Sequence, residues 1–285
     1  MTDKPHACFA LPGHHVVALQ GRDAMNFAQA QFMSDVKSLA DGQWHWSGWL
    51  TPKGRVVALF ALLRRDAETV WLVVPDADAE ALAEGLRRFV FRSKVAISVL
   101  DAPVSAAFVE PTHGRLEPAD ARGWLGLAGD VVALDMSGEG GPRTLLVGGE
   151  PAAFDPAAVA RWAAADLAHG LPRLPASQAD AWTPQQLSLE RLRAFSVKKG
   201  CYPGQEIVAR THFLGKAKRG LALLEAGATA AVGSDVLAGG AAIGTVVSAA
   251  GSRALAVLPL ERDATPLSVD GMAVDERPLL GGLER

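Results

Sequence analysis

The chain has 285 residues, of which 49% are hydrophobic and 21% charged, with a formal net charge of -3 and a pI near 6.2. This composition is typical of a folded globular protein with two domains or one large one. The small net charge gives no reason to expect direct nucleic-acid binding by counterion release. The two cysteines, Cys8 and Cys201, form no CxxC pair, and one chain cannot supply the four thiolates of an iron–sulfur cluster.

No window approaches the roughly 18 consecutive apolar residues of a membrane span. The first residues lead into no apolar signal-peptide core. We therefore expect a cytoplasmic protein without membrane contact.

The first third of the chain alternates strand-like and helix-like patterns. Apolar runs bounded by Gly and Pro predict strands at 16–19, 44–50, 55–63, 69–74 and 95–100. A helix is expected after Asp23, which is a plausible N-cap, and a second, amphipathic helix from about 79 to 91. The order β-α-β-β-β-α-β is typical of a ferredoxin-like α+β lobe, expected at residues 1–102.

The second part repeats strands followed by a helix. Strands are expected at 106–110, 123–127, 131–136 and 144–147, and an alanine-rich helix at 152–169 ends at Gly170, a natural C′ position. A further helix is predicted at 185–193. We expect a second lobe at residues 103–216, and short glycine-separated strands predict a small β-barrel or sandwich at 217–285.

The richest cluster of reactive side chains lies between residues 198 and 213. Lys198 and Lys199 could lower the pKa of the Cys201 thiol, although free cysteine is also commonly a small buried hydrophobe. Gln205 and Glu206 together offer the donors and acceptors that grip the edge of a heterocycle.

The secondary structure of this segment is open from sequence alone. Arg210 would share a face with Glu206 if the segment is helical, where the two could form only a surface ion pair. Residues 207–209 could equally be a short strand.

The same segment carries a family signature. It resembles the K-G-C-Y-x-G-Q-E motif of the YgfZ family, folate-binding proteins related to the aminomethyltransferase (T-protein) of the glycine cleavage system. The matching positions are Lys199, Gly200, Cys201, Tyr202, Gly204, Gln205 and Glu206. Further blocks in the family's order are 21–24, 48–55, 92–95, 170–172 and 184–185, so the resemblance covers most of the chain.

The resemblance implies two lobes around a central channel, a C-terminal β-barrel, and tetrahydrofolate or a substituted form as the bound cofactor. It implies Trp162 as a folate contact, with Gln205, Glu206 and Arg210 nearby, the cation close to the anionic glutamate tail. The family's other folate-contacting tryptophan falls at His14, a departure that makes this imidazole the candidate there.

The function implied is support for the maintenance or repair of iron–sulfur enzymes, including those that modify tRNA, with Cys201 as the reactive group. The implied partners are folate and iron–sulfur enzymes or assembly proteins, and we expect a monomer. The sequence does not choose a chemical role for Cys201.

Two departures separate the chain from the true transferases. Ala168 stands where those enzymes have an acidic residue, and residues 75–78 replace an Asn-rich segment with a catalytic Asp. A folate-dependent one-carbon transferase nevertheless stays the enzyme alternative. A position of Asp76 or Asp78 in the pocket would favour it. The other alternative is a non-catalytic adaptor that docks a partner through residues 198–219.

Overall fold

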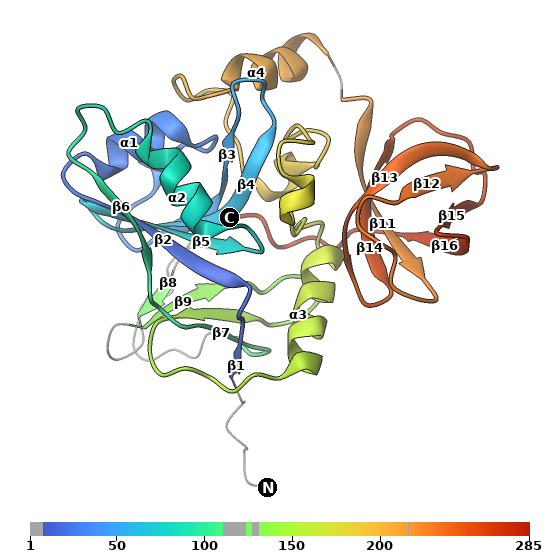
Figure 1. Ribbon diagram of the computed structural model, residues 1–285, viewed down its shortest axis with the longest axis horizontal. Helices are drawn as coiled ribbons and strands as arrows, with labels where there is room; N and C mark the ends of the chain where they lie inside the picture. The colour runs from blue at the N-terminus through green and yellow to red at the C-terminus, as the bar shows by residue number, and fades with distance from the viewer. Residues whose placement is uncertain (1–7, 111–123, 127–130, 216) are drawn as a thin grey trace, which may run out of the picture.

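The computed structural model describes residues 8–110, 124–126, 131–215 and 217–285. Three bodies surround a common centre, namely two sheet-and-helix lobes and a β-barrel (Figure 1). The predicted α+β class with a C-terminal barrel is confirmed. In the part of the chain that the structure describes, no helix is long and apolar enough to cross a membrane.

The first lobe is built on a five-stranded antiparallel sheet of order β3-β4-β5-β2-β6. Its elements are β2 (His14–Gln20), α1 (Ala24–Gln31), the 3-10 turn η1 (Val36–Ser38), β3 (Trp44–Leu50), β4 (Val56–Asp66), β5 (Thr69–Pro75), α2 (Ala79–Arg87) and β6 (Ala96–Leu100). The order of these strands and helices along the chain is the β-α-β-β-β-α-β order expected from the sequence. One sheet face packs on α1 and α2, and the other faces the second lobe, because alternate side chains of each strand enter two different cores.

The second lobe holds a sheet of order β1-β7-β10-β9-β8 and one long helix. Its elements are β1 (Phe9–Ala10), β7 (Val104–Ala107), β8 (Trp124–Gly126), β9 (Val132–Asp135), β10 (Thr144–Val147) and α3 (Pro156–Ala168). Asp155 caps α3 by accepting from Ala157 and Ala158, and Gly170 takes the left-handed φ of +71°. Strand β1 lies before the first lobe in sequence and pairs with β7, so the chain crosses between lobes at its start.

The C-terminal body is a closed antiparallel barrel of order β11-β14-β13-β12-β15-β16. Its strands are β11 (Arg219–Ala226), β12 (Asp235–Ala238), β13 (Ala241–Ala250), β14 (Arg253–Pro259), β15 (Leu267–Val269) and β16 (Met272–Arg277). Small apolar side chains fill its core, as expected for a barrel of this size.

The segment between α3 and the barrel is mostly irregular. It contains two 3-10 turns, η2 (Ala176–Gln178) and η3 (Leu189–Leu192), and the helix α4 (Gln205–Leu214). The helix predicted at 185–193 is wrong, since only η3 forms there. Ser188 and Arg193 both adopt left-handed φ angles, 48° and 54°, and these interrupt the helical path on either side of η3.

Candidate functional site

The signature segment is anchored by two inward side chains. The ammonium group of Lys199 donates to the carbonyls of Gln29 and Phe32, and burial lowers its pKa to about 8. The Tyr202 hydroxyl donates to the Ser196 carbonyl at 3.1 Å, and burial raises the pKa of this phenol. Lys199 also lies 4.8 Å from the centre of the Tyr202 ring. Lys199 therefore fixes the segment to the first lobe, and Tyr202 holds the segment to its own preceding turn.

Gly204 brings the segment onto the turn between β3 and β4. Its φ of +77° is left-handed, and a Cβ there would lie 2.6 Å from the Thr51 carbonyl oxygen and 2.6 Å from the Gly54 Cα. Only glycine allows both the conformation and the contact. Gln185 supports the helix that follows by donating to the Val208 carbonyl at 2.9 Å.

Between these anchors, Cys201 is exposed. The alternative that it is a small buried hydrophobe is therefore wrong. Residues 205–214 form α4, so the helical interpretation of this segment holds and the strand alternative does not. Glu206 and Arg210 point into solvent, whereas Gln205 is half-buried. The signature thus acts as a platform that presents a thiol at the surface.

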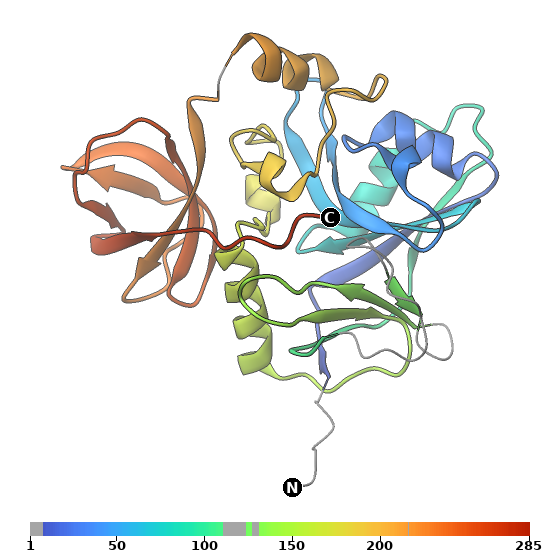
Figure 2. The same cartoon turned by 180° about the vertical axis from the view of Figure 1, so that it is seen from behind.

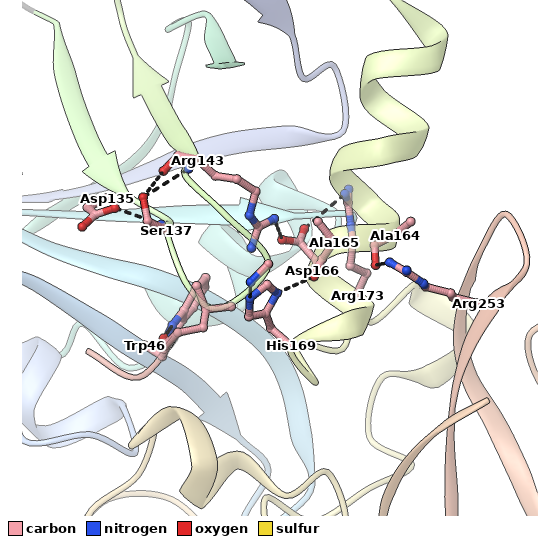
Figure 3. A network of polar contacts seen from close by, with 12 residues as sticks. Trp46, Asp135, Ser137, Arg143, Ala164, Ala165, Asp166, His169, Arg173 and Arg253 are labelled. Atoms are coloured by element: carbon pink, nitrogen blue, oxygen red, sulfur yellow. Dashed lines mark hydrogen bonds and ion pairs between the residues drawn. The ribbon is translucent and has the colours of Figure 1, made fainter. Parts of the chain in front are cut away.

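A second polar cluster lies where the two lobes meet. Arg143, just before β10, donates to Asp166 of α3 at 2.6 Å, and both side chains are only 2% exposed (Figure 3). The same guanidinium lies 4.8 Å from the centre of the Trp162 ring, a cation–π distance. Trp162 is fully buried and also contacts Phe9 and Phe108 edge-on or tilted.

Arg173 extends this cluster to the first lobe. It donates to both carboxylate oxygens of Asp76, one of them at 2.7 Å, and lies 3.7 Å from Asp166. His14 is buried beside it, and the pKa of the imidazole is well below its usual value because of burial, Arg173 and His15. Asp76 and His14 come together because β2 and β5 pair here, with His14 opposite Pro75.

His169 closes the cluster below α3. Its Nδ1 lies 2.7 Å from the Ala165 carbonyl and must donate, whereas its Nε2 accepts from the Gly140 amide at 3.2 Å. The ring is therefore neutral. Burial, opposed by the Ala165 carbonyl, lowers its pKa.

Several nitrogen donors at this junction lack partners. Within the described residues, no hydrogen bond reaches the buried Trp44 Nε1, Trp162 Nε1, or the Nε and Nη2 of Arg143. Buried donors are normally satisfied, so unpartnered ones indicate where a ligand or water binds. Trp44 and Trp162 belong to one hydrophobic core that is shared by both lobes.

The chain from 278 to 285, which we call the tail, returns from the barrel to this junction (Figure 2). The Leu280 amide donates to the Ala168 carbonyl at 2.9 Å, and Trp46 Nε1 donates to the Leu283 carbonyl at 2.8 Å. Arg285 donates to the carbonyls of Asp135 and Ser137, and its guanidinium lies 5.6 Å from the centre of the Trp44 ring. The tail therefore ties the barrel to both lobes.

A cavity of about 420 Å³ opens beside the cluster. Asp76 and Arg173 line it together with α3 and with Val232 and Ser248 of the barrel. All three bodies contribute to its wall, which places Asp76 at the edge of a space large enough for a small ligand.

The structure thus brings together some of the expected site residues and separates others. His14 and Trp162 belong to the junction cluster, linked through Arg173, Asp166 and Arg143. The remaining candidates, Gln205, Glu206 and Arg210, lie on α4 over the tip of the β3–β4 hairpin, apart from that cluster (Figure 1). Among the described residues, no group of three or more His, Cys, Asp or Glu side chains could hold a metal ion.

Sequence reasoning missed Arg143, Asp166, Arg173 and Arg285. A signal existed for Asp166, which stands four residues after Trp162 and so shares its helix face. Arg143 and Arg285 carry no local signal, because their roles depend on contacts between distant segments.

Comparisons with known proteins fit this architecture. The family model described as CAF17, C-terminal beta-barrel domain, matches residues 218–278. A protein named tRNA-modifying protein YgfZ from Colwellia psychrerythraea is 27% identical over 219 residues, covering 72% of this chain and 67% of that protein. A protein of the same name from Klebsiella pneumoniae is 27% identical over 235 residues, covering 76% of this chain and 71% of that protein. These matches confirm the resemblance to the YgfZ family.

An uncharacterized protein of Haemophilus influenzae is also 27% identical, over 80% of this chain and 77% of its own length. Among solved structures, the glycine cleavage system aminomethyltransferase T of Bartonella henselae superposes with a TM-score of 0.71 and 16% identity, covering 96% of this chain and 85% of that one. This likeness establishes an aminomethyltransferase-like fold, and fold alone does not establish activity.

Proposed function

We propose that this YgfZ relative binds a reduced folate at the junction of its lobes and supports iron–sulfur enzymes, including those that modify tRNA, with Cys201 as its reactive group. The observation that carries the folate proposal is the set of unpartnered buried donors of Trp44, Trp162 and Arg143. Tetrahydrofolate offers complementary acceptors in its pterin carbonyl, amide carbonyl and two carboxylates. The fold of an aminomethyltransferase and the names of the relatives support the same proposal.

The residues at the junction have the chemistry that suits such a ligand. Phe108 is partly exposed beside Trp162, whereas Trp44 and Trp162 are fully buried, so contact of a ligand with their rings requires the junction to open. Arg143 and Arg173 supply positive charge, and His14, held neutral, adds no further charge. Folate would contribute one-carbon and redox chemistry of its pterin, while the chain would hold, orient and desolvate it.

The proposal separates the folate site from the thiol. Lys199 and Tyr202 are committed to carbonyl partners and act as anchors. Cys201 therefore serves a step at the surface, toward a partner. This division predicts that folate binding does not need the thiol.

The test is a titration of the purified protein with tetrahydrofolate and 5-formyltetrahydrofolate, followed by tryptophan fluorescence. p-Aminobenzoylglutamate, which lacks the pterin, is the control ligand. We expect saturable quenching by the folates, an equal dissociation constant in Cys201→Ala, and weaker binding of the control. Absence of quenching in both proteins would overturn the folate proposal and favour the non-catalytic adaptor.

A one-carbon transferase is a second candidate, because Asp76 lines the cavity at the junction. Both of its carboxylate oxygens accept from Arg173, so the carboxylate must leave that pair before it can align a substrate nitrogen. One-carbon transfer from an amine donor to tetrahydrofolate, lost in Asp76→Asn with binding retained, would establish this activity. Absence of transfer by a folate-bound wild-type protein would exclude it under the conditions tested.

A further inference from the structure

Helix α4 has an outer face without a partner in the described chain. Of its ten residues only Val208 is buried, whereas Ile207, Phe213 and Leu214 are 38%, 65% and 83% exposed. A surface helix normally turns its large apolar side chains toward the core. Here Phe213 and Leu214 are mostly exposed and Ile207 is partly exposed beside Gly54, and exposed apolar clusters of this kind mark interaction surfaces.

The surroundings of this face are basic. Lys198 and Arg210 are exposed on the segment itself, and Lys218 is exposed just after it. Lys53 is exposed on the β3–β4 turn, where Gly54 approaches Ile207. From 190 to 219 the sequence has eight Lys or Arg and two Glu, although the whole chain carries a net charge of -3. The charge around the apolar side chains therefore complements an acidic surface.

The chemistry of the face argues for a protein partner. Exposed Ile207 and Leu214 bury favourably in an apolar groove, and Phe213 is the only one of the three large apolar side chains of this face with a ring on which a nucleotide base could stack. A second copy of the chain would bring two basic faces against each other in a two-fold interface, which like charges oppose. A partner that presents an apolar groove with an acidic rim satisfies both features.

We propose that the α4 face, defined as Cys201, Ile207, Arg210, Phe213 and Leu214, docks an acidic protein through an apolar groove of that protein. The exposed Cys201 stands a few residues before the helix, so the docked partner lies beside the thiol. This inference is independent of folate binding, since α4 lies apart from the junction cluster (Figure 1). The signature segment then serves as a docking site for the partner as well as the segment that exposes Cys201.

The experiment attaches a benzophenone group to Cys201 in a Cys8→Ser background and irradiates the protein in cell extract. Crosslinked products are identified by mass spectrometry, and the identified partner is then purified and its affinity measured. The test variants are Phe213→Ser with Leu214→Ser, and Arg210→Glu. Leu260→Ser, at a barrel residue that is 58% exposed, is the matched control.

We expect a nuclease-resistant product with an acidic protein. Its yield and the measured affinity should fall at least about tenfold in both test variants and at higher salt, and stay unchanged in Leu260→Ser. Nuclease-sensitive products, a crosslinked dimer of this chain, or an affinity that the test variants leave unchanged would overturn the proposal.

Discussion

The guanidinium of Arg143 and the carboxylate of Asp166 lie 2.6 Å apart, with each side chain 2% exposed. The pair joins the loop before β10 to α3 and lies against the Trp162 ring. Because neither charge can reach water, each depends on the other for its stability in the folded protein. The pair therefore holds the geometry of the junction at which we propose that folate binds.

Asp166→Ala should destabilise the protein by about 3–5 kcal/mol, because it leaves the Arg143 guanidinium buried without its carboxylate. The measurement is urea unfolding followed by far-UV circular dichroism. Glu84→Ala is the matched control, since Glu84 of α2 and Arg88, the C-cap of that helix, form an exposed pair. That variant should change stability by less than about 0.5 kcal/mol. Equal effects of the two variants would contradict the role of the buried pair.

The two glycines of the signature segment should respond differently to alanine. Gly204→Ala forces a side chain into the left-handed region and against the Thr51 carbonyl, whereas a Cβ at Gly200 meets nothing within 4 Å. We expect Gly204→Ala to cost about 1–3 kcal/mol and to speed the reaction of Cys201 with a thiol reagent. Gly200→Ala should do neither. A stable Gly204→Ala variant with unchanged thiol reactivity would contradict the anchoring account.

His14 should make the stability depend on pH. Burial, Arg173 and His15 hold its folded pKa below the ordinary value of about 6.5, so below that pH the unfolded chain binds a proton that the folded one does not. Stability should therefore fall as pH drops from 7 to 5, by at most about 1.4 kcal/mol per pH unit for this group.

The comparison is a series of urea unfolding curves at pH 7, 6 and 5. His14→Phe should reduce the loss of stability on acidification, whereas His15→Gln, which removes only the smallest of the three contributions to the lowered His14 pKa, should retain most of it. If the wild type and His14→Phe lose stability identically between pH 7 and 5, His14 does not cause the pH dependence of stability.

Leu283 should anchor the tail. It is 1% exposed and its carbonyl accepts from Trp46 Nε1. Leu283→Ala should cost about 2–4 kcal/mol through the cavity that it leaves, and should shift the emission of Trp46. Leu260→Ala, at an exposed barrel residue, is the control and should have little effect. Unchanged stability in Leu283→Ala would mean that the tail does not bind the junction.

Local patterns were enough to predict most of the architecture. The alternation of apolar residues predicted the strand and helix order of the first lobe, and the glycine-separated strands predicted a small β-barrel or sandwich. The Cys201 segment stood out because its residue types are rare in combination. Each of these signals lies within a short stretch of chain, where periodicity and turn chemistry act directly.

Features built from distant contacts were not predictable in the same way. Strand β1, the Arg143–Asp166 pair and the path of the tail each join segments far apart in sequence. The helix expected at 185–193 failed because tertiary contacts place Ser188 in a left-handed conformation, where its hydroxyl accepts from the Leu221 amide of the barrel. The division between a buried junction and an exposed thiol became visible only in three dimensions.

The most direct test of the central proposal is hydrogen exchange measured with and without saturating tetrahydrofolate. Binding at the junction predicts slower exchange in β3, in α3 and in the tail, with α4 unchanged. Exchange that stays the same in all three segments, while titration shows that the ligand is bound, would place folate elsewhere and contradict the account.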